Sequence, residues 1–195
     1  MKKILILFAH PALQKSRINK ILIKDINQIE GITFHDLYQA YPEFDINVEY
    51  EKRLLEQHQV IILHHPFFWY STPAILKQWQ DLVLEHGWAY GSKGDALQGK
   101  LFFNVMTSGG RREAYTETGH NNFTIRMLLA PIEQTANLCK MIFLPPFVVH
   151  GTHSINATQV DIFRDDYHKL LSLIRDDKLN ISKARELEYL NDYLE

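Results

Sequence analysis

The sequence predicts an α/β protein: a three-layer sandwich in which a five-stranded parallel sheet, with strand order 2-1-3-4-5, carries helices on both faces. Two observations lead to this fold. Four apolar runs are continuous rather than alternating, as is typical of strands buried on both sides. Helical patterns separate these runs, and right-handed crossovers between parallel strands then leave few topologies. The length of 195 residues suits one domain.

The strands are predicted from apolar residues that follow one another without interruption. The four runs are KILILFAH (3–10), VIILHH (60–65), KLFFNVMTS (100–108) and KMIFLPPFVVHG (140–151). Pro145 and Pro146 interrupt the last run. A shorter piece, ITFHDLY (32–38), alternates between apolar and polar residues and is therefore predicted as an edge strand.

The helices are predicted from apolar residues that recur at helical spacing. The segments with this pattern are 16–30, 72–85, 121–138 and 158–174. The last stretch of the chain is highly charged and lies outside the core pattern. We therefore expect residues 1–175 to form the main domain and residues 176–195 a helical extension of it, packed on its surface or against a partner.

Composition and charge exclude several classes of protein. Hydrophobic residues make up 46% and charged residues 23%, which is typical of a globular protein. The formal net charge of -2 gives no electrostatic footprint for nucleic acid. No apolar run approaches the ~20 residues that span a membrane, and the N-terminal run is predicted as a strand rather than a signal peptide. These features predict a cytoplasmic protein.

The cysteine and histidine residues do not predict a metal or thiol site. Cys139 is the single cysteine and lies in a helical pattern, so we expect a buried, inert thiol. His64 and His65 are adjacent on a strand and must point to opposite faces. His150 and His153 could share a metal ion, but no third ligand is evident. No metal site is expected.

Three unusual segments follow predicted strands. They are HPALQKSRIN (10–19), PFFWYSTP (66–73) and TSGGRREAYTETGHNN (107–122). In an open α/β sheet the ligand crevice lies beyond the carboxyl ends of the strands, where the strand order reverses. The sequence therefore predicts that these three segments form a binding site at one edge of the sheet.

The first segment has the features of a phosphate site. Ser16 is a good N-cap with Asn19 three residues on, and the free N–H groups of a helix start bind phosphate. The alternative is that Ser16 only caps the helix. The segment contains neither GxGxxG nor a P-loop, which disfavours a Rossmann dinucleotide site and a kinase.

The other two segments suit a flat ligand. In the segment 107–110, the glycine pair Gly109 and Gly110 lets the backbone approach a ligand closely. The planar aromatic rings at 67–70 suit a planar heterocycle. The alternatives are a tight turn for the glycines, and ordinary core or an oligomer contact for the aromatic residues.

A family resemblance rests on several of these motifs together. The segments HPFFWYSTPAILKQW (65–79), HGWAYG (86–91) and TSGG (107–110) resemble the flavodoxin-like NAD(P)H:quinone oxidoreductases. The similarity runs from Ile4 to about His153. It is closest to the branch of potassium-efflux ancillary proteins and general stress proteins, because LYQAYPEFDI (37–46) and LPPF (144–147) also resemble that branch.

The resemblance implies an FMN cofactor, with FAD less expected, and NAD(P)H as co-substrate. The residues that match the phosphate loop are His10, Ser16, Arg17, Ile18 and Asn19. Those that match the loops around the flavin ring are Phe67, Phe68, Trp69, Tyr70, Thr107, Ser108, Gly109 and Gly110. Tyr115 and His120 resemble the catalytic Tyr and His of the family, although His120 comes one residue early. The alternative for these two is a polar surface loop.

Three functions remain open from the sequence. The first is an enzyme that transfers hydride from NAD(P)H through flavin to quinones by a ping-pong mechanism. The second is a regulatory subunit of a glutathione-gated potassium-efflux transporter, held at the inner face of the membrane by that partner. The third is a one-electron carrier of the flavodoxin type, which the near-neutral charge and the missing T/S-x-T-G-x-T loop disfavour. The aromatic residues of 66–70 and 88–90 also predict a homodimer.

Overall fold

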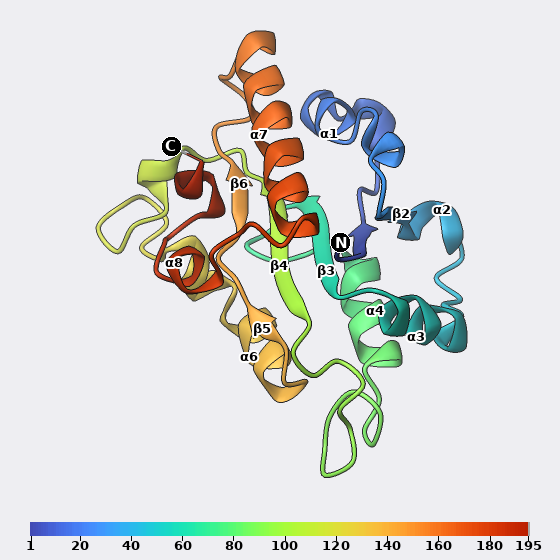
Figure 1. Cartoon of the computed structure of the whole chain (residues 1–195). Coiled ribbons are helices and arrows are strands. Elements are labelled where there is room, and N and C mark those ends of the chain that lie inside the picture. Colours follow the sequence, from blue (N-terminus) through green and yellow to red (C-terminus); the bar gives the residue numbers. More distant parts are fainter. Residues whose placement is uncertain (195) are drawn as a thin grey trace.

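A parallel sheet forms the middle layer of the protein (Figure 1). The computed structural model describes residues 1–194. The strands are β1 (Ile4–Phe8), β2 (Ile32–Asp36), β3 (Val60–Pro66), β4 (Leu101–Thr107), β5 (Ile142–Phe143) and β6 (Phe147–Val149). The strand order β2-β1-β3-β4-β5 confirms the predicted topology, and β6 adds a sixth strand that also pairs with β4. All the pairings are parallel.

Every residue of β1, β3 and β4 is buried, because helices cover both faces of the sheet. Alternate side chains divide between two apolar clusters. Leu5 and Leu7 belong to the cluster covered by the helices at 48–57, 74–83 and 130–138. Ile4 and Ile6 belong to the cluster covered by the helices at 17–22 and 157–175. The continuous apolar runs of the sequence are therefore the expected signature of this three-layer arrangement.

The predicted fifth strand, 140–151, is split in two. β5 pairs with the start of β4, and β6 pairs with its end. The residues between them include Pro145 and Pro146, which have no N–H group to donate to a sheet ladder. The predicted last strand is therefore present as two short strands, and the proline pair is the physical reason.

The helices between the strands follow the predicted order. They are α1 (Arg17–Leu22), α2 (Leu37–Ala40), α3 (Val48–Gln57), α4 (Ala74–Val83), α5 (Ile125–Leu128), α6 (Ala130–Leu138), α7 (Ala157–Arg175) and α8 (Ile181–Arg185). Short 3-10 turns lie at Leu13–Lys15, Ile26–Gln28, Arg112–Ala114 and Leu190–Tyr193. Within residues 1–194, no helix has both the length and the apolar character needed to span a membrane.

Three predicted boundaries differ from the structure. The helix expected over 16–30 ends at Leu22, and the chain turns at Asp25, whose φ of 60° is left-handed. The edge strand expected over 32–38 ends at Asp36, because the carboxylate of Asp36 caps α2. The helix expected over 121–138 begins only after its N-cap, Thr124.

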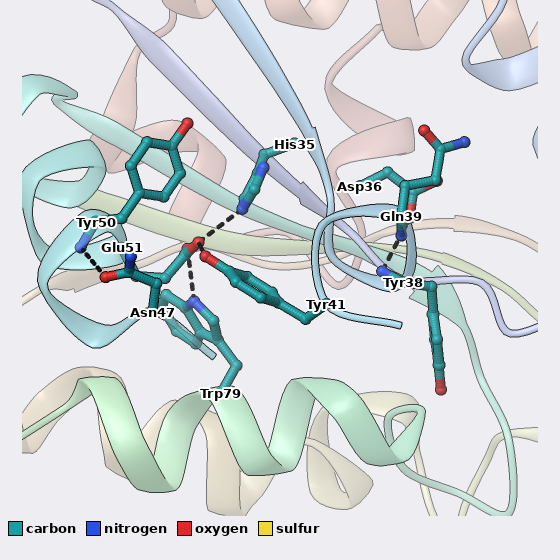
Figure 2. A network of polar contacts seen from close by, with 9 residues as sticks. All are labelled: His35, Asp36, Tyr38, Gln39, Tyr41, Asn47, Tyr50, Glu51 and Trp79. Carbon is teal, nitrogen blue, oxygen red and sulfur yellow. Dashed lines mark hydrogen bonds and ion pairs between the residues drawn. The ribbon is translucent and has the colours of Figure 1, made fainter. Parts of the chain in front are cut away.

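Helix α3 was not predicted from the sequence. A buried carboxylate on this helix bonds it to the neighbouring elements (Figure 2). Glu51 is fully buried, and one of its oxygens lies 2.5 Å from the Tyr41 hydroxyl and 2.7 Å from His35 Nε2. Its other oxygen accepts the indole N–H of Trp79 at 2.8 Å. Since His35 is on β2 and Trp79 is on α4, this one side chain ties α3 to both neighbours.

The C-terminal segment is not the single surface helix that its charge suggested. It forms α8 and a 3-10 turn, and it buries Tyr189 and Leu190 in the two apolar clusters. The Asp192 carboxylate accepts two hydrogen bonds from Arg112, both at 2.7 Å. The division of the chain at residue 175 stays a prediction, and residue 195 of the extension lies outside the described residues.

Candidate active site

Two neighbouring cavities open at the edge where β1, β3 and β4 end. The first has a volume of about 540 Å³ and takes its walls from the loops after all three strands. The predicted residues that line it are His10, Ser16, Arg17, Ile18, Asn19, Phe67, Phe68, Thr107 and Gly109. The sheet topology therefore brings the three segments singled out by sequence to one place.

The second cavity is more aromatic and has a volume of about 390 Å³. Its predicted lining residues are Phe67, Trp69, Tyr70, Gly109, Gly110, Tyr115 and His120. Phe67, Gly109 and His153 line both cavities, so the two adjoin each other. Ser108 is the predicted residue that lines neither, because it is buried beneath the loop.

Ser16 and Asn19 form the polar floor of the first cavity. The Ser16 hydroxyl caps α1 by accepting the backbone N–H of Asn19 at 3.1 Å. It also accepts the side-chain amide of Asn19 at 3.1 Å, and the same amide donates to the Thr107 hydroxyl at 3.1 Å. A hydroxyl has two lone pairs and one proton. Ser16 therefore retains its proton for a ligand in the cavity.

Arg17 and His10 complete this end of the site. The Arg17 guanidinium donates to the backbone oxygens of Thr152 and Ile155, at 2.9 and 2.7 Å, and so holds the loop after β6 against the cavity. His10 accepts the N–H of Ala12 on Nδ1 at 3.1 Å. Burial lowers the pKa of His10, which favours the neutral ring with its proton on Nε2.

The aromatic loop after β3 divides its four rings between the core and the solvent. Phe67 is 8% exposed, whereas Trp69 is 93% exposed. Trp69 and Tyr70 have φ values of 49° and 61°, a left-handed conformation that is strained for bulky side chains. Tyr70 donates a hydrogen bond to Asn121 at 3.2 Å. Backbone strain of this kind persists where the surrounding structure or a function requires it.

Tyr115 lies beside the glycine pair. A Cβ atom at Gly110 would come within 2.8 Å of the Tyr115 ring, so this glycine is needed for close packing. Tyr115 is 6% exposed, and its hydroxyl accepts a hydrogen bond from Ser108 Oγ at 2.8 Å. Because that bond uses a lone pair, the phenolic proton is free to be donated into the second cavity. His120 lines the same cavity.

The sequence reasoning missed several residues of the site. Lys15, Thr152 and His153 line the first cavity, and Asn121 lines the second. The loop holding Thr152 and His153 follows β6, so the rule that ligands bind at the carboxyl ends of strands could have found it.

No group of three or more potential metal ligands occurs over the range 1–194. Cys139 is buried, and burial raises the pKa of its thiol.

Two ends of different chemistry thus meet in one crevice. The first offers hydroxyl donors together with the ammonium group of Lys15, which suits an anion. The second offers aromatic walls and glycine backbone, which suits a flat ring.

A protein family described as having a flavodoxin-like fold matches residues 2–171, which is most of the chain.

The chain belongs to this flavodoxin-like fold family.

Relatives within the family include proteins of the predicted branch. The ancillary protein KefG of a glutathione-regulated potassium-efflux system, from Pectobacterium carotovorum, is 45% identical over 76% of this chain and 81% of its own length. The NAD(P)H oxidoreductase YrkL of Bacillus subtilis is 43% identical over 81% of this chain and 91% of its own. These matches confirm the resemblance found in the motifs.

Solved structures of the family agree with the fold. The general stress protein 14 of Treponema denticola, determined in complex with FMN, has a TM-score of 0.84 and 35% identity, over 88% of this chain and 99% of its own. An NADPH-quinone reductase from P. pentosaceus has a TM-score of 0.78 and 34% identity, over 86% of this chain and 96% of its own. Both structures therefore share the flavodoxin-like fold of this chain over most of its length.

Proposed function

We propose that the protein is an FMN-dependent NAD(P)H oxidoreductase that reduces quinones or similar small electrophiles. The observation that carries this proposal is the crevice itself, in which a donor-rich cavity adjoins an aromatic one at the sheet edge. The FMN-bound relative and the quinone reductase support the choice of cofactor and acceptor.

The residues fit FMN at both ends. The Ser16 and Thr107 hydroxyls, with the Lys15 ammonium, would hold the phosphate, whose oxygens are acceptors. Phe67, Trp69 and the backbone of Gly109 and Gly110 would enclose the ring. When bound, FMN would supply the redox chemistry, in which a hydride from NAD(P)H and a proton convert a quinone to its hydroquinone.

Residues of the protein would make the nicotinamide and the quinone bind one after the other. Trp69, Tyr70 and Tyr115 line the aromatic cavity, which is the space next to the proposed flavin ring. Nicotinamide and quinone would therefore use the same space in turn. Tyr115, with its free phenolic proton, would donate a hydrogen bond to negative charge that develops at the ring edge.

Two measurements test the function. The purified protein should show the absorbance bands of a flavin, and the flavin released on denaturation should be FMN. Steady-state turnover of NAD(P)H and quinone should give parallel double-reciprocal plots at several fixed quinone concentrations. Apoprotein that cannot be reconstituted with FMN would contradict the cofactor, and intersecting plots would contradict the shared space.

A second candidate function is regulatory, and the similarity to KefG favours it. In this proposal the protein binds a potassium-efflux transporter at the inner face of the membrane. Co-purification of the tagged protein with such a transporter from detergent-solubilised membranes of its own organism tests it. Recovery of the protein without any transporter would leave the enzyme as the supported function.

We also propose a homodimer, based on the aromatic loop after β3. Phe68, Trp69 and Tyr70 are 45%, 93% and 49% exposed, and exposed apolar patches mark interfaces. Trp88 contributes less than the sequence suggested, because its indole N–H is bonded to Glu56 within the chain. Sedimentation velocity at micromolar concentration should show a dimer that Trp69→Ser weakens. A fully active wild-type monomer would exclude it.

A further inference from the structure

We propose that His64 and Tyr167 are positioning residues that fix the first cavity as a donor site for a phosphate monoester. They lie at the far end of a buried polar chain that leads from α7 through β3 to the Ser16 and Thr107 hydroxyls. The inference deepens the proposed FMN function and rests on it for the identity of the ligand.

The chain of contacts is continuous and shielded from water. The Tyr167 hydroxyl lies 3.5 Å from His64 Nδ1, and His64 Nε2 lies 3.2 Å from the side-chain oxygen of Asn19. The amide nitrogen of Asn19 then donates to both Ser16 and Thr107, at 3.1 Å each. His64 and Tyr167 are fully buried, and Asn19 is 2% exposed.

Tyr167 determines which atoms donate and which accept along this chain of hydrogen bonds. Over residues 1–194, His64 Nδ1 is the one acceptor within hydrogen-bond distance of the Tyr167 hydroxyl. A buried hydroxyl proton without an acceptor is costly. Burial also lowers the pKa of His64 to about 3, so the ring is neutral and carries a single N–H. If Nδ1 accepts from Tyr167, that proton must be on Nε2.

The His64 tautomer then fixes the orientation of Asn19. An Nε2–H group needs an acceptor, so the Asn19 oxygen faces His64 and its NH₂ group faces the two hydroxyls. Ser16 Oγ now accepts two hydrogen bonds, one from the Asn19 side chain and one from its backbone. Both of its lone pairs are used, so it can meet a ligand only as a donor.

The opposite tautomer of His64 would turn the hydroxyls of the first cavity from hydrogen-bond donors into acceptors. With the proton on Nδ1, His64 Nε2 would accept from a flipped Asn19 amide, whose oxygen would then face Ser16 and Thr107. Both hydroxyls would donate to that oxygen and present lone pairs to the cavity, where phosphate oxygens are acceptors only. The buried hydrogen-bond chain therefore favours a ligand with a terminal phosphate, such as FMN, over one that ends in a hydroxyl, such as riboflavin. A hydroxyl can also accept these bonds, but bonds to a charged phosphate oxygen are roughly twice as strong.

The first experiment reads the tautomer directly. Long-range ¹H–¹⁵N correlation spectra of the ¹⁵N-labelled apoprotein distinguish a protonated Nε2 from a protonated Nδ1. We expect His64 to be the Nε2–H tautomer in the wild type. Tyr167→Phe removes the hydrogen bond to Nδ1 that favours this tautomer, so a minor fraction of the Nδ1–H form should become detectable in that variant. A wild-type Nδ1–H tautomer would overturn the inference, whatever the protein binds.

The second experiment measures phosphate selectivity as the ratio of the dissociation constants for riboflavin and FMN. In His64→Leu the ratio should fall roughly tenfold or more, through weaker FMN binding, since a hydrogen bond to a charged group is lost. Tyr167→Phe, a milder change, should lower it several-fold. His65→Leu is the matched control, because His65 is equally buried on the same strand but contacts Asn104 instead.

The outcomes separate the two proposals. A selectivity ratio that is unchanged in both His64→Leu and Tyr167→Phe would overturn the positioning role, and so would an equal fall in His65→Leu. A wild type that binds neither flavin would refute the proposed FMN function, and the tautomer would still decide the inference about the chain's own residues.

Discussion

At the scale of single residues, Ser16 has one observed role and one proposed role. Its hydroxyl caps α1 and faces the first cavity. The cap stabilises the fold, whereas the hydroxyl proton would act in the proposed binding of a phosphate. The two can be told apart, because other helices of the protein have caps remote from the crevice.

Ser16→Ala should lose both roles. Loss of the cap should lower the free energy of unfolding by about 1 kcal/mol, as measured by urea denaturation. Loss of the hydroxyl should weaken FMN binding, as measured by quenching of flavin fluorescence. Asn47→Ala, which removes the cap of α3, should lower stability by a similar amount and leave FMN affinity unchanged. Equal FMN affinity in Ser16→Ala and the wild type would refute the phosphate assignment.

Tyr115→Phe keeps the aromatic ring and removes one proton donor from the second cavity. One hydrogen bond to a charged group is worth ~1.5–3 kcal/mol, so reduction of bound FMN by NAD(P)H should slow roughly 10- to 150-fold. Stopped-flow absorbance measures this rate, while FMN affinity should change little. Tyr50→Phe, at an exposed tyrosine on α3, is the control. Wild-type reduction rates in Tyr115→Phe would make Tyr115 a packing residue only.

At the scale of secondary-structure elements, the strands were more predictable than the helices. Buried parallel strands are apolar throughout, so each gives a strong local signal. Helix α3 gives a weak signal, because it buries only Glu51 and Leu55 and its other residues are exposed or half-buried. What holds α3 in place is a polar contact with β2 and α4, which no local pattern reveals.

Glu51→Gln should therefore destabilise the protein. The substitution replaces one carboxylate oxygen by a donor that faces a buried N–H or O–H group, at a cost of about 1–3 kcal/mol. The change is measured from the urea midpoint of unfolding. Glu49→Gln on the same helix is exposed and should shift stability by about 0.5 kcal/mol or less. Equal shifts in the two variants would show that the Glu51 contacts do not stabilise the fold.

At the scale of the whole molecule, buried and half-buried histidines make stability depend on pH. Burial lowers the pKa of six of them, namely His10, His58, His64, His65, His150 and His168. A histidine whose pKa is lower in the folded state binds its proton more readily when unfolded. Stability is therefore complete above the unfolded pKa of about 6.5 and is lost as the pH falls below it.

His150 offers a test of this dependence. Burial, with the nearby charge of Arg112, lowers its pKa to about 4. Between about pH 7.5 and about pH 5, this one group should account for about 2 kcal/mol of the lost stability. Urea unfolding at the two pH values should show a smaller difference for His150→Gln than for the wild type. A difference that His150→Gln leaves unchanged would mean that His150 titrates normally in the folded protein.

The sequence alone determined the topology and the place of the candidate site. Continuous apolar runs separated by helical patterns allow few arrangements, and in a parallel sheet the segments after the strands must meet at one edge. The aromatic loop, the glycine pair and Ser16 were therefore predictable as neighbours, and so was the family. Their individual roles in binding and catalysis remain predictions.

Only the tertiary structure decided whether the hydroxyl groups of that site donate or accept hydrogen bonds. Which way the Asn19 amide points, and so whether Ser16 donates or accepts, depends on His64 and Tyr167. His64 is 45 residues from Asn19, and Tyr167 is 103 residues from His64. Local patterns carry backbone preference and burial, because these act over a few residues. The direction of a hydrogen bond is set by whichever groups the fold brings together, and only the folded chain contains that information.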